Sequence, residues 1–339
     1  MTAPSVPSTR PAPAALGHRL RQIAVFAVLF ALALLFASEE PAFATVQNLL
    51  SVLQSVAVVA IIGVGVTLSM AVGGFDLSAG ALAASTVMAT SYAMVVWHLE
   101  APGAAAFGFG LGLAVGLVNA LLIVWLRVPD LLATLSVNFL LTGLQLIPTA
   151  GRSIATGLIL PDGRSADGHF DPAFLSLGRA KLFDKVPLPV LLMLAVAVLA
   201  ALFTERTRYG RLLFATGGNE RAARLAGAPT RRLRILAYAL SGLLAALGGI
   251  IVSARVGRGD VSSGASLLLD AVAAALIGHA VLNARRPNVF GTVVGAVFVG
   301  VVLNGLTMLN VPYYTQDFVK GAVLVGALAL TYGSTRQPA

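Results

Sequence analysis

The chain has 339 residues, of which 58% are hydrophobic and 11% are charged, and its mean hydropathy is +0.89. Repeated apolar runs of about 18 residues or more exclude a soluble domain and are too long and continuous for barrel strands, so membrane-spanning helices remain. The net charge of +9 comes mainly from arginines in short loops, which indicates membrane topology rather than nucleic-acid binding, and the lack of cysteine excludes disulfides and thiolate metal sites.

These runs predict an all-α fold, a polytopic bundle of about ten transmembrane spans that forms a single domain over residues 23–333. The spans are expected at about 23–38, 48–72, 79–98, 103–126, 131–149, 187–203, 235–253, 266–282, 289–309 and 316–333. Small-xxx-small spacing predicts close helix packing at Gly108, Gly112 and Gly116 and at Gly291 and Gly295.

The distribution of basic residues predicts the orientation of these spans. With a cytoplasmic N-terminus, fifteen lysines and arginines fall inside and seven outside, so the positive-inside rule places both termini in the cytoplasm. Residues 1–22, rich in Pro, Ala, Ser and Thr, are then a disordered cytoplasmic tail, and 334–339 a second tail. Residues 150–186 form a long outside loop, and 204–234 form an inside loop.

A signal peptide is the alternative interpretation of the N-terminus. Arg19 and Arg21 resemble a charged n-region, residues 23–37 an apolar h-region, and Ala42-Phe43-Ala44 a cleavage site. Because many further spans follow, an uncleaved first helix is the simpler account.

The segment Gly73-Gly74-Phe75-Asp76-Leu77-Ser78-Ala79-Gly80 interrupts two apolar runs. Adjacent glycines permit a helix to break, and Asp76 or Ser78 could cap the helix that follows. A broken helix at membrane depth is tolerated where it is buried in protein or lines a cavity. Asp76 and Ser78 are therefore candidates to line or gate a pathway, and the alternative for Asp76 is a satisfied cap near the membrane boundary.

Other polar residues inside the spans are candidates to line a route for a hydroxylated solute, because neutral donors and acceptors replace hydration without a charge penalty. The alternative, which is the commoner role of any one such residue, is a polar contact that holds two helices together. The candidates are Asn48, Gln54, Asn119, Asn138, Gln145 and Asn304, together with Asp270. Asp317 and Lys320, three positions apart, predict a packing or anchoring pair on one helix face. The four histidines lack a ligand partner at i+3 or i+4, so no metal site is predicted.

The inside loop 204–234 carries eight arginines and predicts a short helix outside the bilayer. Asn219 is a plausible N-cap, and Glu220 and Arg224 share one helix face. Gly227 suits the C-terminal end and Pro229 prevents continuation, so the helix should cover residues 220–226. The alternative is a charged loop that only enforces topology.

Several motifs together resemble the ribose-type ABC sugar permeases. Tyr209-Gly210-Arg211, Ala215 to Glu220 and Ala222 to Gly227 are similar to that family's cytoplasmic loop pattern, close to GRxxxAxGGNxxAARLxGI. The run Gly73 to Gly80 resembles its GGIDLSVG motif. Further matches are Ala133-Thr134-Leu135, Thr149 to Ser153 and Leu269 to Ala274, so the resemblance covers about residues 45–332.

The resemblance implies the transmembrane subunit of an importer in the bacterial inner membrane, which is not itself an enzyme. Such subunits pair as homo- or heterodimers in lipid, receive sugar from a periplasmic binding protein, and seat a coupling helix on each cytoplasmic ABC ATPase. By position, the coupling residues are Gly217, Gly218, Asn219, Glu220, Ala223, Arg224 and Gly227. The chain has no GxxxxGK[ST] phosphate loop, so ATP and Mg²⁺ are expected on the partner, with no cofactor bound here.

The outside loop 150–186 is then a periplasmic loop. We expect it to help dock the binding protein, whose lobes would present acidic groups, and the alternative is a merely solvated loop. The docking candidates are Arg152, Arg164, Arg255 and Arg258.

Two other function classes stay open at the level of the sequence. A permease for branched-chain amino acids shares the broad architecture, although GGFDLS and GGNERAARL favour the sugar group. An autonomous secondary transporter or channel would need a coupling-ion site, and the sequence shows no convincing pair of intramembrane carboxylates.

Overall fold

The computed structural model describes residues 13–264, 266–282 and 286–332, so most of the predicted tails lies outside the described residues. The helices are α1 (Pro13–Glu39), η1 (Pro41–Ala44), α2 (Val46–Ala71), α3 (Ala79–Val95), α4 (Ala101–Ala120), η2 (Leu121–Trp125), α5 (Asp130–Leu144), η3 (Ile147–Thr149), α6 (Pro172–Arg179), α7 (Leu188–Arg206), α8 (Arg208–Gly218), α9 (Glu220–Leu225), α10 (Thr230–Val256), α11 (Leu267–Leu282), α12 (Val289–Met308) and α13 (Tyr313–Tyr332). Within the described chain the fold is almost entirely helical, as predicted.

Each of the ten predicted apolar segments falls on a helix, although among the residues that the structure describes only six stretches are long and apolar enough to cross a membrane by themselves. These stretches are Val46–Ala71, Ala101–Trp125, Asp130–Thr149, Leu188–Arg206, Thr230–Val256 and Val289–Met308. The helices α3 and α11 are apolar but short, with 17 and 16 residues. The number of ten spans therefore stays a prediction, as does the orientation of the termini.

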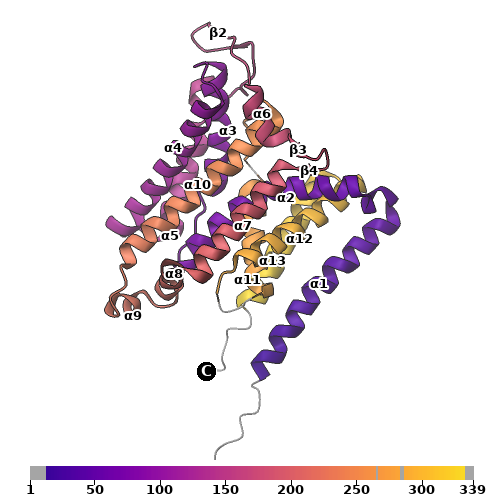
Figure 1. Cartoon of the computed structure of the whole chain (residues 1–339), viewed down its shortest axis with the longest axis vertical. Helices are drawn as coiled ribbons and strands as arrows, with labels where there is room; N and C mark the ends of the chain where they lie inside the picture. The colour runs from indigo at the N-terminus through magenta and orange to yellow at the C-terminus, as the bar shows by residue number, and fades with distance from the viewer. Residues whose placement is uncertain (1–12, 265, 283–285, 333–339) are drawn as a thin grey trace, which may run out of the picture.

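The long helix α1 begins at Pro13, earlier than the predicted start at residue 23, so it includes part of the predicted tail. It stands to one side of the bundle in Figure 1. Near its end it packs on α12, where the Phe36 ring occupies the space left open by Gly305.

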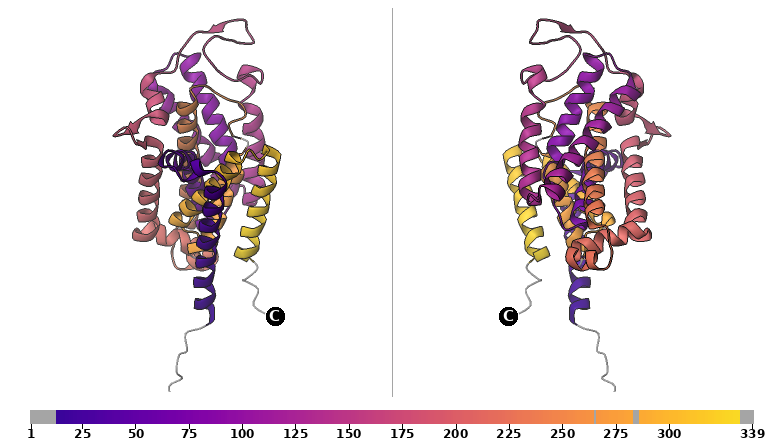
Figure 2. Two further views of the ribbon diagram at one scale, coloured as in Figure 1. Left: turned by 90° about the vertical axis from the view of Figure 1, so that its right-hand side faces the viewer. Right: turned by 90° about the vertical axis from the view of Figure 1, so that its left-hand side faces the viewer.

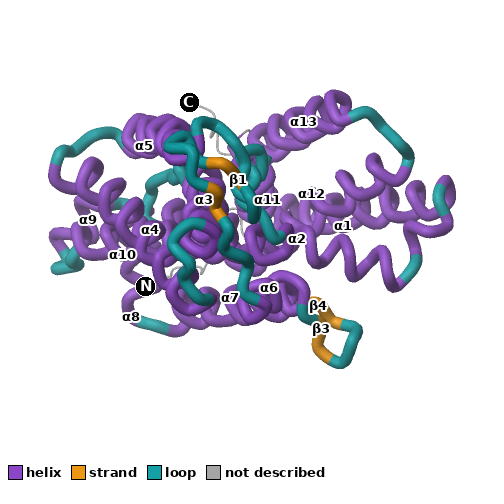
Figure 3. Tube along the Cα trace, turned by 90° about the horizontal axis from the view of Figure 1, so that it is seen from above, coloured by secondary structure: helices purple, strands orange, loops and turns teal. Residues whose placement is uncertain are grey.

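The core of the bundle forms where α2 and α10 pack on their neighbours. Residues such as Ile61, Ile62 and Ile251 are fully buried there, with relative exposures of 1% or less. Figure 3 shows α2 and α3 lying between α5 and α13 on one side and α6 and α7 on the other. The outer helix α5 presents exposed apolar side chains such as Phe139 and Leu140, a surface suited to lipid or to a second subunit.

The predicted glycine packing is confirmed in both pairs of helices. A Cβ at Gly112 of α4 would lie only 2.6 Å from the carbonyl oxygen of Gly242 in α10. On the second pair, Gly295 of α12 meets the backbone of Ala274 in α11 in the same way. The backbones approach this closely because these positions lack a side chain.

In the described part of the chain, the β-strands form two small hairpins. The strands β1 (Leu158–Ile159) and β2 (Ser165–Ala166) are antiparallel, with Leu158 opposite Ala166. The strands β3 (Lys181–Leu182) and β4 (Val186–Pro187) pair in the same sense, with Lys181 opposite Pro187. Figures 1 and 2 show the β1–β2 hairpin at one end of the molecule and α8 and α9 toward the other.

Candidate functional site

The helix α9 forms where the sequence predicts it, bounded by its expected caps. Asn219 has extended backbone angles, and its side-chain oxygen accepts a hydrogen bond from the Ala222 amide at 2.9 Å. The helix ends at Leu225, and Gly227 follows with a φ of +83°, a conformation that favours glycine. Leu225 itself is 84% exposed, so this polar loop displays one large apolar side chain to its surroundings.

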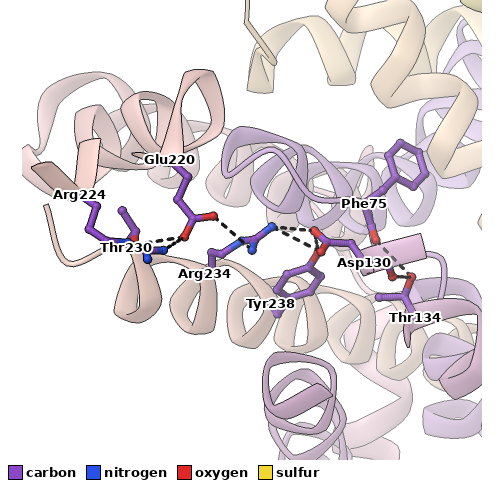
Figure 4. A network of polar contacts seen from close by, with 8 residues as sticks. All are labelled: Phe75, Asp130, Thr134, Glu220, Arg224, Thr230, Arg234 and Tyr238. Carbon is purple, nitrogen blue, oxygen red and sulfur yellow. Dashed lines mark hydrogen bonds and ion pairs between the residues drawn. The ribbon is translucent and has the colours of Figure 1, made fainter. Parts of the chain in front are cut away.

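The predicted pair of Glu220 and Arg224 is present, and Glu220 also connects α9 to α10. The Glu220 carboxylate forms an ion pair with Arg224 one turn later. It also lies 3.4 Å from the Arg234 guanidinium and accepts a hydrogen bond from the Thr230 hydroxyl at 3.3 Å. Figure 4 shows these side chains converging between α9 and the first turns of α10. These contacts hold the short helix α9 against the long, largely buried helix α10.

Arg234 also forms an ion pair with Asp130, the first residue of α5. Its guanidinium lies 3.2 Å from the Asp130 carboxylate, which also accepts a hydrogen bond from the Tyr238 hydroxyl at 2.8 Å. The side chains of Arg234 and Asp130 are only 20% and 16% exposed. A pair with so little access to water is worth more than a surface ion pair, and is costly to break.

The break between α2 and α3 completes the network. Thr134, one turn into α5, donates a hydrogen bond to the Phe75 carbonyl at 3.2 Å. Figure 4 shows the resulting path from Glu220 through Arg234 and Asp130 toward Phe75. Gly73, with a φ of +77°, lies against Gly217 at the end of α8, where an added Cβ would sit 3.3 Å from the Gly217 Cα. The loop 204–234 thus touches the break directly as well as through side chains.

Asp76 is buried within this break, and side chains and a backbone amide of the protein itself satisfy its carboxylate. Its carboxylate accepts hydrogen bonds from the Ser78 amide at 2.9 Å, the Ser78 hydroxyl at 2.6 Å and the Ser241 hydroxyl at 2.7 Å. Asn119 donates to the Ser78 hydroxyl at 2.8 Å, and Asn138 donates to the Leu77 carbonyl at 2.8 Å. Three of the predicted pathway residues, Asp76, Ser78 and Asn138, therefore hold the break in place.

The remaining pathway candidates lie in a different part of the bundle. Asn48 and Asn304 form a reciprocal amide pair at 3.0 and 3.2 Å. Asn304 and Asp270 line one cavity of about 360 Å³ between α2, α11 and α12. Gln54 lies apart from them and donates to the Gly178 carbonyl at 3.2 Å.

The predicted pair of Asp317 and Lys320 forms at 3.8 Å, but Lys320 has a closer partner. Its ammonium group lies 3.3 Å from Asp270, which joins α13 to α11. This shorter contact shows an anchoring role between two helices in addition to the predicted pair on one face.

Of the four candidate docking arginines, three lie in loops, namely Arg152, Arg164 and Arg258, and Arg255 lies in the last turn of α10. Arg164 and Arg258 form ion pairs with Asp162 at 2.7 Å and Asp260 at 3.0 Å, so part of their charge is neutralised locally. The pKa of Asp162 is lowered by a backbone hydrogen bond from Arg164 and then by that side chain. Within the described chain, Arg152 and Arg255 form no ion pair, but only Arg152 is exposed, whereas Arg255 is partly buried.

The sequence prediction missed the middle of the network, namely Asp130, Thr134, Arg234, Tyr238 and Ser241. A usable signal existed for three of them. Arg234, Tyr238 and Ser241 are spaced at i, i+4 and i+7, which places them on one helix face. A charged and polar stripe on a helix this apolar indicates buried partners.

Comparison with known proteins places the chain in a family of transporter subunits. Residues 48–328 match the family described as "Branched-chain amino acid transport system / permease component", and the chain belongs to this family. It is 35% identical to the ribose import permease protein RbsC of Escherichia coli K12 over 91% of this chain and 92% of that protein. It is 33% identical to RbsC of Bacillus subtilis over 92% of each chain.

More distant relatives extend the same pattern. The D-allose transport system permease protein AlsC of Escherichia coli K12 is 29% identical over 90% of each chain. These named relatives are sugar permeases, which favours the sugar interpretation over the amino-acid alternative that the family description mentions. A comparison with solved structures found no match.

Proposed function

We propose that this chain is the transmembrane subunit of an ABC importer that moves a monosaccharide or a similar small polyol across the bacterial inner membrane. The sequence relatives support the sugar class, and their similarity extends over nearly the whole chain. In this arrangement the protein has about ten spans, both termini are cytoplasmic, and it works as a homo- or heterodimer with a periplasmic binding protein. ATP and Mg²⁺ act on a partner ATPase, which docks at α9.

The observation that carries the proposal is the bracing of α9. A helix of six residues cannot transmit force alone, but Glu220 ties it to Arg234 of α10, and Arg234 ties it to Asp130 of α5. Leu225 is free to enter a cleft in the ATPase subunit. When nucleotide binding closes the ATPase pair, α9 moves as a rigid body and displaces α5 and the break at residues 72–78. The transporter then switches between outward-open and inward-open states.

The test is to break the brace at α9. Glu220→Ala and Arg224→Glu should leave the protein in the membrane but reduce sugar uptake per ATP hydrolysed. The first change removes the contacts of α9 with Thr230 and Arg234 of α10, and the second puts a negative charge beside the Glu220 carboxylate that makes those contacts. Uptake and ATPase activity are measured together in proteoliposomes that contain the ATPase and the binding protein.

The matched control is Arg232→Glu, which makes the same charge change at an exposed position in the same loop, outside the network. Normal uptake per ATP in both α9 variants would contradict the proposal and would leave the loop 204–234 with the role of setting membrane topology only.

A further inference from the structure

A polar pocket of about 450 Å³ lies between α9 and the turn that joins η2 to α5. Its charged lining consists of four arginines and two carboxylates, namely Arg127, Arg224, Arg231, Arg234, Asp130 and Glu220. Two carboxylates neutralise two guanidinium groups, so the pocket keeps an excess of two positive charges. The pocket is therefore electrostatically suited to an anion.

The hydrogen-bonding groups show the same excess of donors. Both carboxylates are already engaged by Arg224, Arg234 and Tyr238. Within the described chain Arg127 and Arg231 form no ion pair, and the buried Nε of Arg234 has no hydrogen-bond partner. A guanidinium group has donors only, so a ligand that binds in this pocket would have to supply acceptor oxygens.

The far wall of the pocket leads onto an apolar surface. Ile123 and Val124 of η2 line the pocket, and the neighbouring Leu121 and Trp125 are 48% and 59% exposed. Trp side chains are enriched where a membrane meets water. The turn then places Arg127, with a φ of +58°, beside this surface. Charge and exposed apolar area are thus adjacent, as in the head and tail of a lipid.

We propose that this pocket binds the phosphate group of an anionic membrane lipid whose acyl chains lie along the exposed side of η2. The phosphate oxygens accept hydrogen bonds from Arg127, Arg231 and the Nε of Arg234. Basic pockets between helices on the cytoplasmic side of a membrane bind lipid head groups. The inference rests on the proposed function only for placing this face at the inner leaflet. Because Arg234 also braces α9, a bound lipid stiffens the coupling connection.

The experiment measures lipid retention by the purified full-length protein in native mass spectrometry, with phosphatidylglycerol and phosphatidylcholine as probes. The wild type should prefer phosphatidylglycerol. Arg127→Gln and Arg231→Gln should each weaken phosphatidylglycerol binding about fivefold, and both together about 25-fold. Neither residue belongs to the α9 brace. Arg232→Gln, an exposed neighbour that does not line the pocket, should leave binding unchanged.

Three results would overturn the proposal. The first is equal retention of the two lipids by the wild type, which needs no variant. The second is binding of inorganic phosphate alone without a preference for phosphatidylglycerol, which makes free phosphate the ligand. The third is unchanged lipid binding in the variants with weaker association of the ATPase, which assigns the pocket to an acidic side chain of that partner. Since lipid retention is measured without sugar or ATP, its failure leaves the uptake test of the proposed function intact.

Discussion

At the scale of single residues, Arg234 holds the central position because it contacts two carboxylates on different elements. Glu220 of α9 also contacts Thr230, and Asp130 of α5 also contacts Tyr238, but of these residues Arg234 contacts both carboxylates. The guanidinium group is planar and can face both partners at once, which a lysine ammonium cannot reproduce. The residue therefore acts as a positioning group for α9.

Arg234→Ala should destabilise the protein by about 2 kcal/mol, because Asp130 and Glu220 lose a partner in a site with little access to water. Arg234→Lys should recover part of this stability but less of the coupling between ATP hydrolysis and uptake. Thermal unfolding in detergent and uptake per ATP in proteoliposomes are the measurements, and Arg232→Ala, at an exposed position that does not line the pocket, is the matched control. Wild-type coupling in Arg234→Ala would remove this residue from the transmission path.

At the scale of elements, the break between α2 and α3 is a junction rather than a flexible gap. Asp76 accepts hydrogen bonds from Ser78 and from Ser241 of α10. Asn119 of α4 donates to the Ser78 hydroxyl and Asn138 of α5 donates to the Leu77 carbonyl, so three helices hold the irregular backbone of the break. Gly73 brings the end of α2 against Gly217 of α8. We therefore expect motion of the loop 204–234 to be transmitted to α2 and α3 by direct contact.

Gly73→Ala should be strongly harmful at this junction, because its φ of +77° is strained for alanine by about 1–2 kcal/mol and the new Cβ would press on Gly217. Gly110→Ala in α4 is the matched control, since nothing lies within 4 Å of a Cβ there and its φ is not positive. The two variants are compared by sugar uptake at equal membrane content. Equal uptake by both would show that the close approach of α2 and α8 has no role in transport.

At the scale of the whole molecule, the sequence was sufficient for what depends on local pattern. Hydropathy located the ten helical segments, and the cap signals of Asn219 and Gly227 located α9 to within a residue. The sequence alone could not predict the network, because the side chains of Arg234 and Tyr238 contact Asp130, which lies 104 and 108 positions away in the chain. Such pairs depend on which helix faces meet, and helices this uniformly apolar show little periodicity to indicate it.

The central claim, that α9 meets the ATPase at the cytoplasmic face, is tested most directly by cysteine labelling, since the chain has no cysteine of its own. Leu225→Cys in α9 is compared with Ile159→Cys in β1, which is 59% exposed and lies at the opposite end of the molecule (Figure 1). In spheroplasts, a membrane-impermeant maleimide should label the β1 cysteine only. In opened membranes it should also label the α9 cysteine, and the ATPase subunit should protect it. Labelling of the α9 cysteine from outside, or equal labelling with and without the ATPase, would contradict the account.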